Sequence, residues 1–130
     1  MDQSDHSIRF HPPSNPLGHE VAHELREALS GCPDLAFAYL VDVHVDEFGD
    51  APNQSLFVWL QPEALSSLRG ALNLVSEAVA RTIPGDRFLD VLILNSAPEL
   101  LVDLERSGCL FVERDSGERA RAIEAVDRIS

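Results

Sequence analysis

The stretch His19-Glu20-Val21-Ala22-His23 holds the most suggestive set of chemical groups in the sequence. Two histidines four positions apart share one face of a helix, so both imidazoles can bind the same metal ion. A glutamate beside the first histidine can then act as a general base toward a metal-bound water. His19 and His23 are therefore candidate zinc ligands and Glu20 a candidate base, as in a small zinc-dependent hydrolase.

The helix that must carry this motif directs it away from the predicted core. Residues 17–30 repeat apolar side chains at helical spacing, and this stripe predicts the buried face. His19 and His23 lie opposite the stripe, and Leu25-Arg26-Glu27 follows where a third histidine is needed. We predict an exposed histidine pair without a catalytic zinc site; weak capture of zinc or nickel stays open. The stripe consists of Leu17, Val21, Leu25, Ala28 and Leu29.

A second polar set lies on a predicted long strand. Residues 35–46 alternate between two faces, and Asp42, His44 and Asp46 share one of them. Such a set can hold a divalent cation, or it can form a base with its orienting carboxylate. The simpler interpretation is the solvated end of a hairpin. We predict an interaction surface there rather than a reaction centre.

Composition narrows the possible partners. The chain has 130 residues, 45% of them hydrophobic, which suits one folded domain. Its formal net charge is −12 and it contains no lysine, so we expect neither a nucleic-acid nor a membrane partner. No apolar run reaches the ~18 residues that span a bilayer, and the polar N-terminus is unlike a secretion signal, which predicts a cytoplasmic protein. Cys32 and Cys109 are predicted to be buried free thiols.

Periodicity along the chain predicts an α/β (α+β) fold. We expect a mixed β-sheet of about four strands with helices packed on it, in the order α-β-β-α-β-α-β-α. The proline-rich residues 1–16 are predicted to form an extended arm without regular pairing. Residues 17–114 form the predicted domain and residues 115–130 a C-terminal helix. The elements expected are helix 17–30, strands 35–46 and 55–60, helix 62–83, strand 88–94, helix 96–106, strand 109–112 and helix 118–129.

Two of these elements carry further expectations. Strand 88–94 is almost continuously apolar, which predicts a buried and central strand. The last helix, which Ser116 can cap, has one apolar side and otherwise charged faces. It can pack on the body of the protein or on a neighbouring subunit.

Several short strings follow the order of a known family. In the first half they are Ile8-Arg9-Phe10, Pro33-Asp34-Leu35 and Ala38-Tyr39-Leu40, and in the second half residues 89–94 and 108–114. Spanning about residues 8–114, they resemble the C-terminal domain of the enhanced serine sensitivity protein SseB. The resemblance implies a compact α/β domain without an assigned activity, usually appended to another domain of that protein. It supplies no catalytic residues.

A weaker resemblance involves the runs 90–98 and 110–115. These look like the tail of minimal nucleotidyltransferases of the antitoxin type. That resemblance implies a site in which a Gly-Ser pair and carboxylates hold Mg²⁺ on a nucleoside triphosphate. Here Asp42-Val43 stands where the Gly-Ser pair belongs, and Gln54-Ser55-Leu56 lacks the carboxylates. The resemblance therefore implies a relic without its metal site.

The absence of a convergent polar set predicts a non-catalytic α/β module without a cofactor, which works through protein contacts as a homodimer or with another protein. Its expected contact surface is the strand face with Asp42, His44 and Asp46, or the helix 118–129. The alternatives are the zinc hydrolase at His19 and His23 and the nucleotidyltransferase relic.

Overall fold

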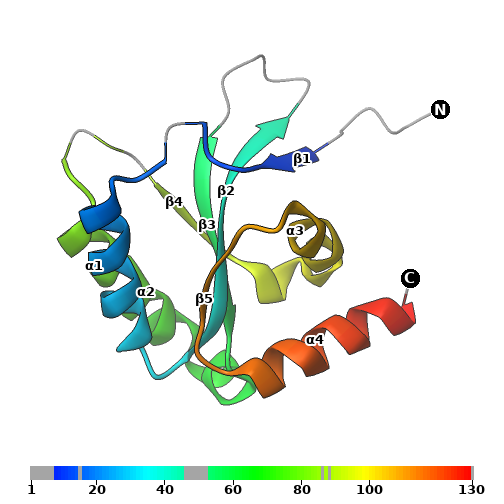
Figure 1. Cartoon of the computed structure of the whole chain (residues 1–130). Coiled ribbons are helices and arrows are strands. Elements are labelled where there is room, and N and C mark those ends of the chain that lie inside the picture. Colours follow the sequence, from blue (N-terminus) through cyan, green and yellow to red (C-terminus); the bar gives the residue numbers. More distant parts are fainter. Residues whose placement is uncertain (1–7, 15, 46–52, 86, 88, 130) are drawn as a thin grey trace.

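A computed structural model describes residues 8–14, 16–45, 53–85, 87 and 89–129 (Figure 1). Strands and helices alternate through most of the chain, with short 3₁₀ turns between some of them. In chain order the elements are β1 (Ile8–His11), α1 (His19–Ser30), β2 (Leu35–Val45), β3 (Asn53–Leu60), the 3₁₀ turn η3 (Pro62–Ser67), α2 (Leu68–Thr82), β4 (Asp90–Ile93), the 3₁₀ turns η4 (Leu94–Ser96) and η5 (Pro98–Leu100), α3 (Leu101–Ser107), β5 (Leu110–Glu113) and α4 (Ser116–Ile129).

Strand β2 forms the centre of a mixed sheet. β3 pairs with it as an antiparallel hairpin, and β4 adds to β3 in parallel. Along the other edge of β2, two short strands lie end to end and antiparallel to it: β1 beside residues 42–45 and β5 beside residues 37–39. The predicted α/β class with a mixed sheet is confirmed, with five strands among the described residues instead of about four.

Helices cover both faces of this sheet, α1 and α2 on one side and α3 and α4 on the other (Figure 1). Side chains of β2 alternate between the two layers: Ala38 and Leu40 join the cluster with α1 and α2, and Phe37 and Tyr39 join the one with α3 and α4. Phe37 stacks on Trp59 with 5.7 Å between ring centroids. Burial on both faces explains why β2 is apolar over most of its length.

The prediction of an unpaired arm is wrong for residues 8–11. β1 pairs with the far end of β2, Ile8 opposite Val45 and His11 opposite Asp42. Proline removes a backbone donor only at its own position, so Pro12 ends the strand without preventing the preceding residues from pairing.

The predicted central position of strand 88–94 is also wrong. β4 lies at the edge of the sheet, and within the described residues it pairs with β3 alone. Val91 and Ile93 pack against the α1–α2 cluster, whereas Leu92 belongs to the other face and is 42% exposed. The apolar run therefore reflects what lies above and below the strand, and not a neighbour on its second edge.

Two of the predicted helices begin as 3₁₀ turns. The expected helix 62–83 consists of η3 and then α2, and the expected helix 96–106 consists of η4, η5 and then α3. Pro62 and Pro98 each stand in the first turn of a 3₁₀ segment, where a missing backbone donor removes no hydrogen bond. The helical periodicity of these regions is correct, but the regular α-helices begin later.

Helix α4 packs on the body of the protein. Ala122 and Val126 are buried in the cluster with α3 and β2. The predicted cap, Ser116, is the first helical residue, and the cap is instead Asp115, whose Oδ1 accepts a hydrogen bond from the backbone N of Glu118 at 2.9 Å. Of the two predicted alternatives, packing on the body is therefore the one observed, and a contact of α4 with another protein stays a prediction.

Candidate functional site

Helix α1 places the histidine motif on its outer face. Leu25 and Leu29 are fully buried, whereas His19 and His23 are exposed, as the apolar stripe predicts. With Glu20 and a neighbouring glutamate, the pair lines a shallow surface hollow. Among the described residues, no group of three or more His, Cys, Asp or Glu side chains is placed to hold a metal ion. The arrangement offers two imidazoles to solvent and no recessed site in which a bound water could be activated.

The predicted strand-face surface is not accessible at Asp42. This residue is only 6% exposed, and its Oδ2 accepts hydrogen bonds from the backbone N and the hydroxyl of Ser14, at 2.8 and 2.9 Å. Asp42 thus fastens the segment that follows β1 to the end of β2. His44 is half-buried beside Arg9 of β1, and Asp46 lies outside the described residues. The expectation of an exposed polar stripe is wrong for Asp42.

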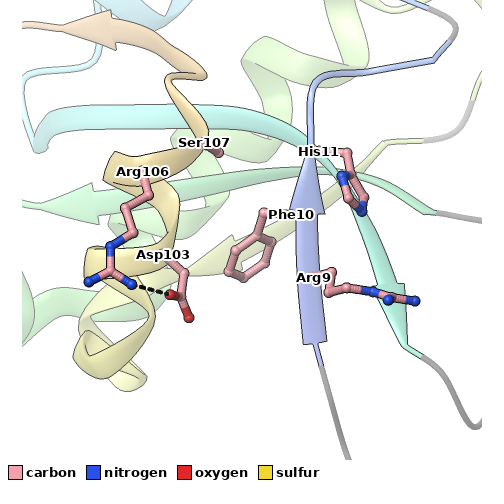
Figure 2. Close-up of a pocket in the computed structure, with 6 residues that line it drawn as sticks. All are labelled: Arg9, Phe10, His11, Asp103, Arg106 and Ser107. Carbon is pink, nitrogen blue, oxygen red and sulfur yellow. Dashed lines mark ion pairs between the residues drawn. The ribbon is translucent and has the colours of Figure 1, made fainter.

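A pocket of about 310 Å³ lies between β1 and α3 (Figure 2). Phe10 extends from β1 toward α3, whereas the side chains of Arg9 and His11 point away on the far side of the strand. On α3, Arg106 forms an ion pair with Asp103 at 3.9 Å. The polar groups at this pocket do not converge on a common point, so the pocket shows no arrangement for acid–base or metal chemistry.

A half-buried polar network ties α4 to the rest of the fold. Arg119 binds both carboxylate oxygens of Glu105, at 2.7 and 2.9 Å, and Glu113 at 2.9 Å. The Tyr39 hydroxyl donates to the same Glu105 carboxylate. Burial lowers the pKa of Arg119, but hydrogen bonds with Glu105 and Glu113 outweigh it and raise the pKa above its usual value. Every charge here has a partner, so we interpret the network as structural.

Neither cysteine is in a disulfide. Cys32 is buried, as predicted, whereas Cys109 is half-buried. Burial raises the pKa of the Cys32 thiol above its usual value, although Arg114 and Arg81 act in the opposite direction. A buried thiol that stays protonated is a poor nucleophile, so Cys32 serves the core rather than a reaction.

An accessible apolar groove lies at the β4 edge. A groove of about 470 Å³ extends from the sheet face beneath α3 around β4 to the start of α2. Leu92 is its most exposed hydrophobic member, and among the described residues that line it, Ser96 has the only polar side chain. The groove is lined by Phe10, Val43, Phe57, Leu72, Val91, Leu92, Ile93, Ser96, Ala97 and Leu100.

The apolar surface continues from the groove onto α2. Leu68 lies one helical turn before Leu72, on the same side of α2, and is 37% exposed. Leu65, in the preceding η3 turn, is exposed as well. Isolated exposed leucines are common, but exposed leucines together with an open apolar groove are typical of a site of contact. We call this surface, made by the groove with Leu65 and Leu68, the β4 surface.

The sequence contained only part of the signal for this site. The apolar run 88–94 pointed to burial, but Phe10, Phe57 and Leu100 come from three distant segments and only the fold brings them together. The predicted helix 62–83 does not specify which of its leucines stay exposed, and in the structure Leu65 and Leu68 do. Sequence reasoning therefore identified these residues as apolar without identifying which of them remain accessible.

Comparisons of the chain with protein-family models, with curated proteins and with solved structures found no match. The resemblances to the SseB domain and to minimal nucleotidyltransferases therefore stay predictions. Across the described residues, no helix combines the length and the apolar character needed to cross a membrane.

Proposed function

We propose that this protein is a non-catalytic interaction module that binds another protein through the β4 surface. The observation that carries the proposal is the apolar groove at a sheet edge where β4 pairs, within the described part of the chain, with β3 alone, and where Leu92 is 42% exposed. A folded protein gains free energy by covering such a surface, at roughly 25 cal/mol per Å² of apolar area. The resemblance to the SseB domain, a domain without an assigned activity, agrees with this proposal.

The chemistry of the groove favours a protein over a small molecule. Sites for small ligands combine an apolar enclosure with several convergent polar groups that fix the ligand's orientation. The β4 groove is open, and Ser96 is the only polar side chain in its lining. A partner that supplies a broad apolar face therefore fits better than a metabolite.

We infer a cytoplasmic setting for this module. Cys32 and Cys109 are both free thiols, and free thiols persist in a reducing compartment. The strongly acidic chain, at −12, is also poorly suited to anionic surfaces such as nucleic acid or membrane lipid.

Site-specific photo-crosslinking in the cells that make the protein tests this function. Leu92 is replaced by the photo-reactive residue p-benzoylphenylalanine, and a matched control carries the same residue at Glu77, an exposed position of α2. We expect a discrete covalent adduct with a second polypeptide from position 92 and none from position 77. Adducts of the same pattern from both positions, or no adduct at all, would contradict a protein-binding role for the β4 surface.

A further inference from the structure

The composition of β4 does not fit its position. Edge strands are normally protected by charged residues, proline or a covering segment, because an open edge pairs with other chains. β4 reads Asp90-Val91-Leu92-Ile93, so Asp90 is the one charged residue of the strand and the three residues after it are apolar. Within the described residues it has one neighbour, β3. Apart from Asp90, the strand itself carries no charge or proline that would prevent another chain from pairing with it.

The backbone of β4 is regular enough to accept another strand. Its register with β3 is uninterrupted, from Ser55 opposite Asp90 to Val58 opposite Ile93. In a regular strand about half of the backbone N–H and C=O groups point to each side, so those directed away from β3 face the outer edge. An added strand can use these groups without any rearrangement of the sheet.

The surroundings of β4 also define the side chains of such a strand. Successive residues of a strand point to opposite faces of the sheet. On one face they would meet Leu92 and Leu100, and on the other Leu72 of α2. An added strand is therefore expected to be apolar on both faces over about four residues, the length of β4.

Charge distinguishes between the possible partners. The chain carries 22 acidic and 10 basic residues, and Asp90 and Glu99 adjoin the groove-lining residues Val91 and Leu100. Two copies of this chain would bring like charges together, which disfavours a homodimer through this edge. A basic partner would instead be attracted by the net negative charge of the chain, and Asp90 and Glu99 would help to orient it at the groove.

The geometry thus points to an extended, positively charged segment of another protein as the occupant of the β4 surface. The segment has a short apolar centre flanked by arginine or lysine, and it joins β4 as a further strand of the sheet. Main-chain hydrogen bonds supply affinity, and the groove around Leu92 selects the apolar side chains. This inference rests on the proposed protein-binding function and specifies the chemistry and conformation of the partner.

A synthetic peptide tests the inference directly. The probe is acetyl-Arg-Arg-Val-Leu-Val-Leu-Arg-Arg-amide, titrated into the ¹⁵N-labelled full chain. A second peptide of equal charge replaces both leucines by proline and so cannot form a regular strand. We expect the first peptide to shift the amide resonances of β4 and to slow their hydrogen exchange. The proline peptide should do neither.

Two protein variants locate the binding. Leu92→Arg places a positive charge in the groove and is expected to weaken binding of the first peptide by about tenfold or more. Ala80→Arg adds the same charge at an exposed position of α2 outside the groove and should leave binding unchanged apart from a small general charge effect. Equal binding of both peptides would show attraction by charge alone and overturn the inference, as would resonance shifts away from β4 or no binding of either peptide.

The remaining outcomes separate this inference from the proposed function. An adduct from position 92 with a second protein, together with failure of the peptide, would leave the interaction surface in place and refute strand addition. A protein that sediments as a dimer, and becomes monomeric as Leu92→Arg but not as Ala80→Arg, would identify a second copy as the occupant and refute the basic partner.

Discussion

Replacing Arg119 by methionine should weaken the attachment of α4 to the body of the protein and lower the free energy of unfolding. Methionine keeps much of the aliphatic bulk but removes the guanidinium that joins Glu105 and Glu113. Glu105 would then retain only the hydroxyl of Tyr39 as its partner in the network. Because Glu105 belongs to α3 and Tyr39 to β2, the change also weakens the contact between these two elements and α4.

The magnitude follows from the burial of the pair. The side chains of Arg119 and Glu105 are 26% and 24% exposed, so the pair is neither open to water nor fully enclosed. Exposed pairs contribute about 0.2–1 kcal/mol, and removal of one partner from a buried pair costs about 3–5 kcal/mol. An intermediate loss of about 2 kcal/mol in the free energy of unfolding is expected. At about 2.1 cal/mol/K per residue for the entropy of unfolding, this lowers Tm by about 7 °C.

Two spectroscopic probes can measure this loss. Far-UV circular dichroism in urea follows unfolding of the whole domain. Fluorescence of Trp59, the single tryptophan, reports on α4, because its indole Nε1 donates to Glu118 Oε2 at 3.0 Å. The control is Arg128→Met on the same helix, where Arg128 and Glu124 lie 3.5 Å apart with side chains 76% and 68% exposed. That variant should lose less than about 0.5 kcal/mol.

A double variant tests whether the loss comes from the pair itself. Glu105→Gln and Arg119→Met share one network, so their separate effects should fail to add by about 1 kcal/mol or more. Equal destabilisation by Arg119→Met and Arg128→Met would refute the reasoning. Strict additivity of the Glu105 and Arg119 changes would refute it as well.

Three further predictions concern other parts of the fold. Leu25→Ala removes a fully buried side chain and should lower the free energy of unfolding, measured in urea, by about 2–5 kcal/mol. His23→Ala, on the exposed face of the same helix, should leave it almost unchanged. Equal losses in the two variants would contradict the assigned orientation of α1. Hydrogen bonds from Gln61 and from the backbone of Glu118 lower the pKa of Asp115, so this carboxylate contributes stability above its unfolded pKa and loses it as the pH falls through the lower folded value. Asp115→Asn should therefore flatten the decline in stability below pH about 4, and an unchanged acid titration would show that the carboxylate is not responsible. Cys109 should react with iodoacetamide well before Cys32, because Cys32 is only 7% exposed and burial raises the pKa of its thiol. Mass spectrometry follows the two reactions, and faster reaction at Cys32 would contradict the prediction.

Features set by neighbouring residues were predictable from the sequence. The orientation of α1 follows from its apolar stripe, and Leu25 and Leu29 are fully buried as that stripe requires. The hairpin of β2 and β3 follows from two alternating runs separated by a short connection. In both cases the pattern of side chains within one segment, or within two adjacent ones, is sufficient to predict the element.

Features set by distant segments were not predictable. β1 is a strand only because residues 42–45 of β2 accept it, and nothing in the string Ile8-Arg9-Phe10-His11 specifies that partner. The Arg119–Glu105 contact joins two helices that the sequence describes separately. One local signal was available and overlooked: Asp115 stands three positions before Glu118, the spacing of a helix cap.

The two strands that share one edge of β2 come from opposite ends of the chain. During synthesis β1 is made before β2. Residues 37–39 of β2, however, lack their β5 neighbour until residues 110–113 emerge from the ribosome. A nascent or truncated chain therefore carries an open, strongly apolar strand in the middle of its sheet, which is a surface prone to aggregation. A chain that ends before residues 110–113 is therefore expected to be degraded rather than to accumulate as a folded domain.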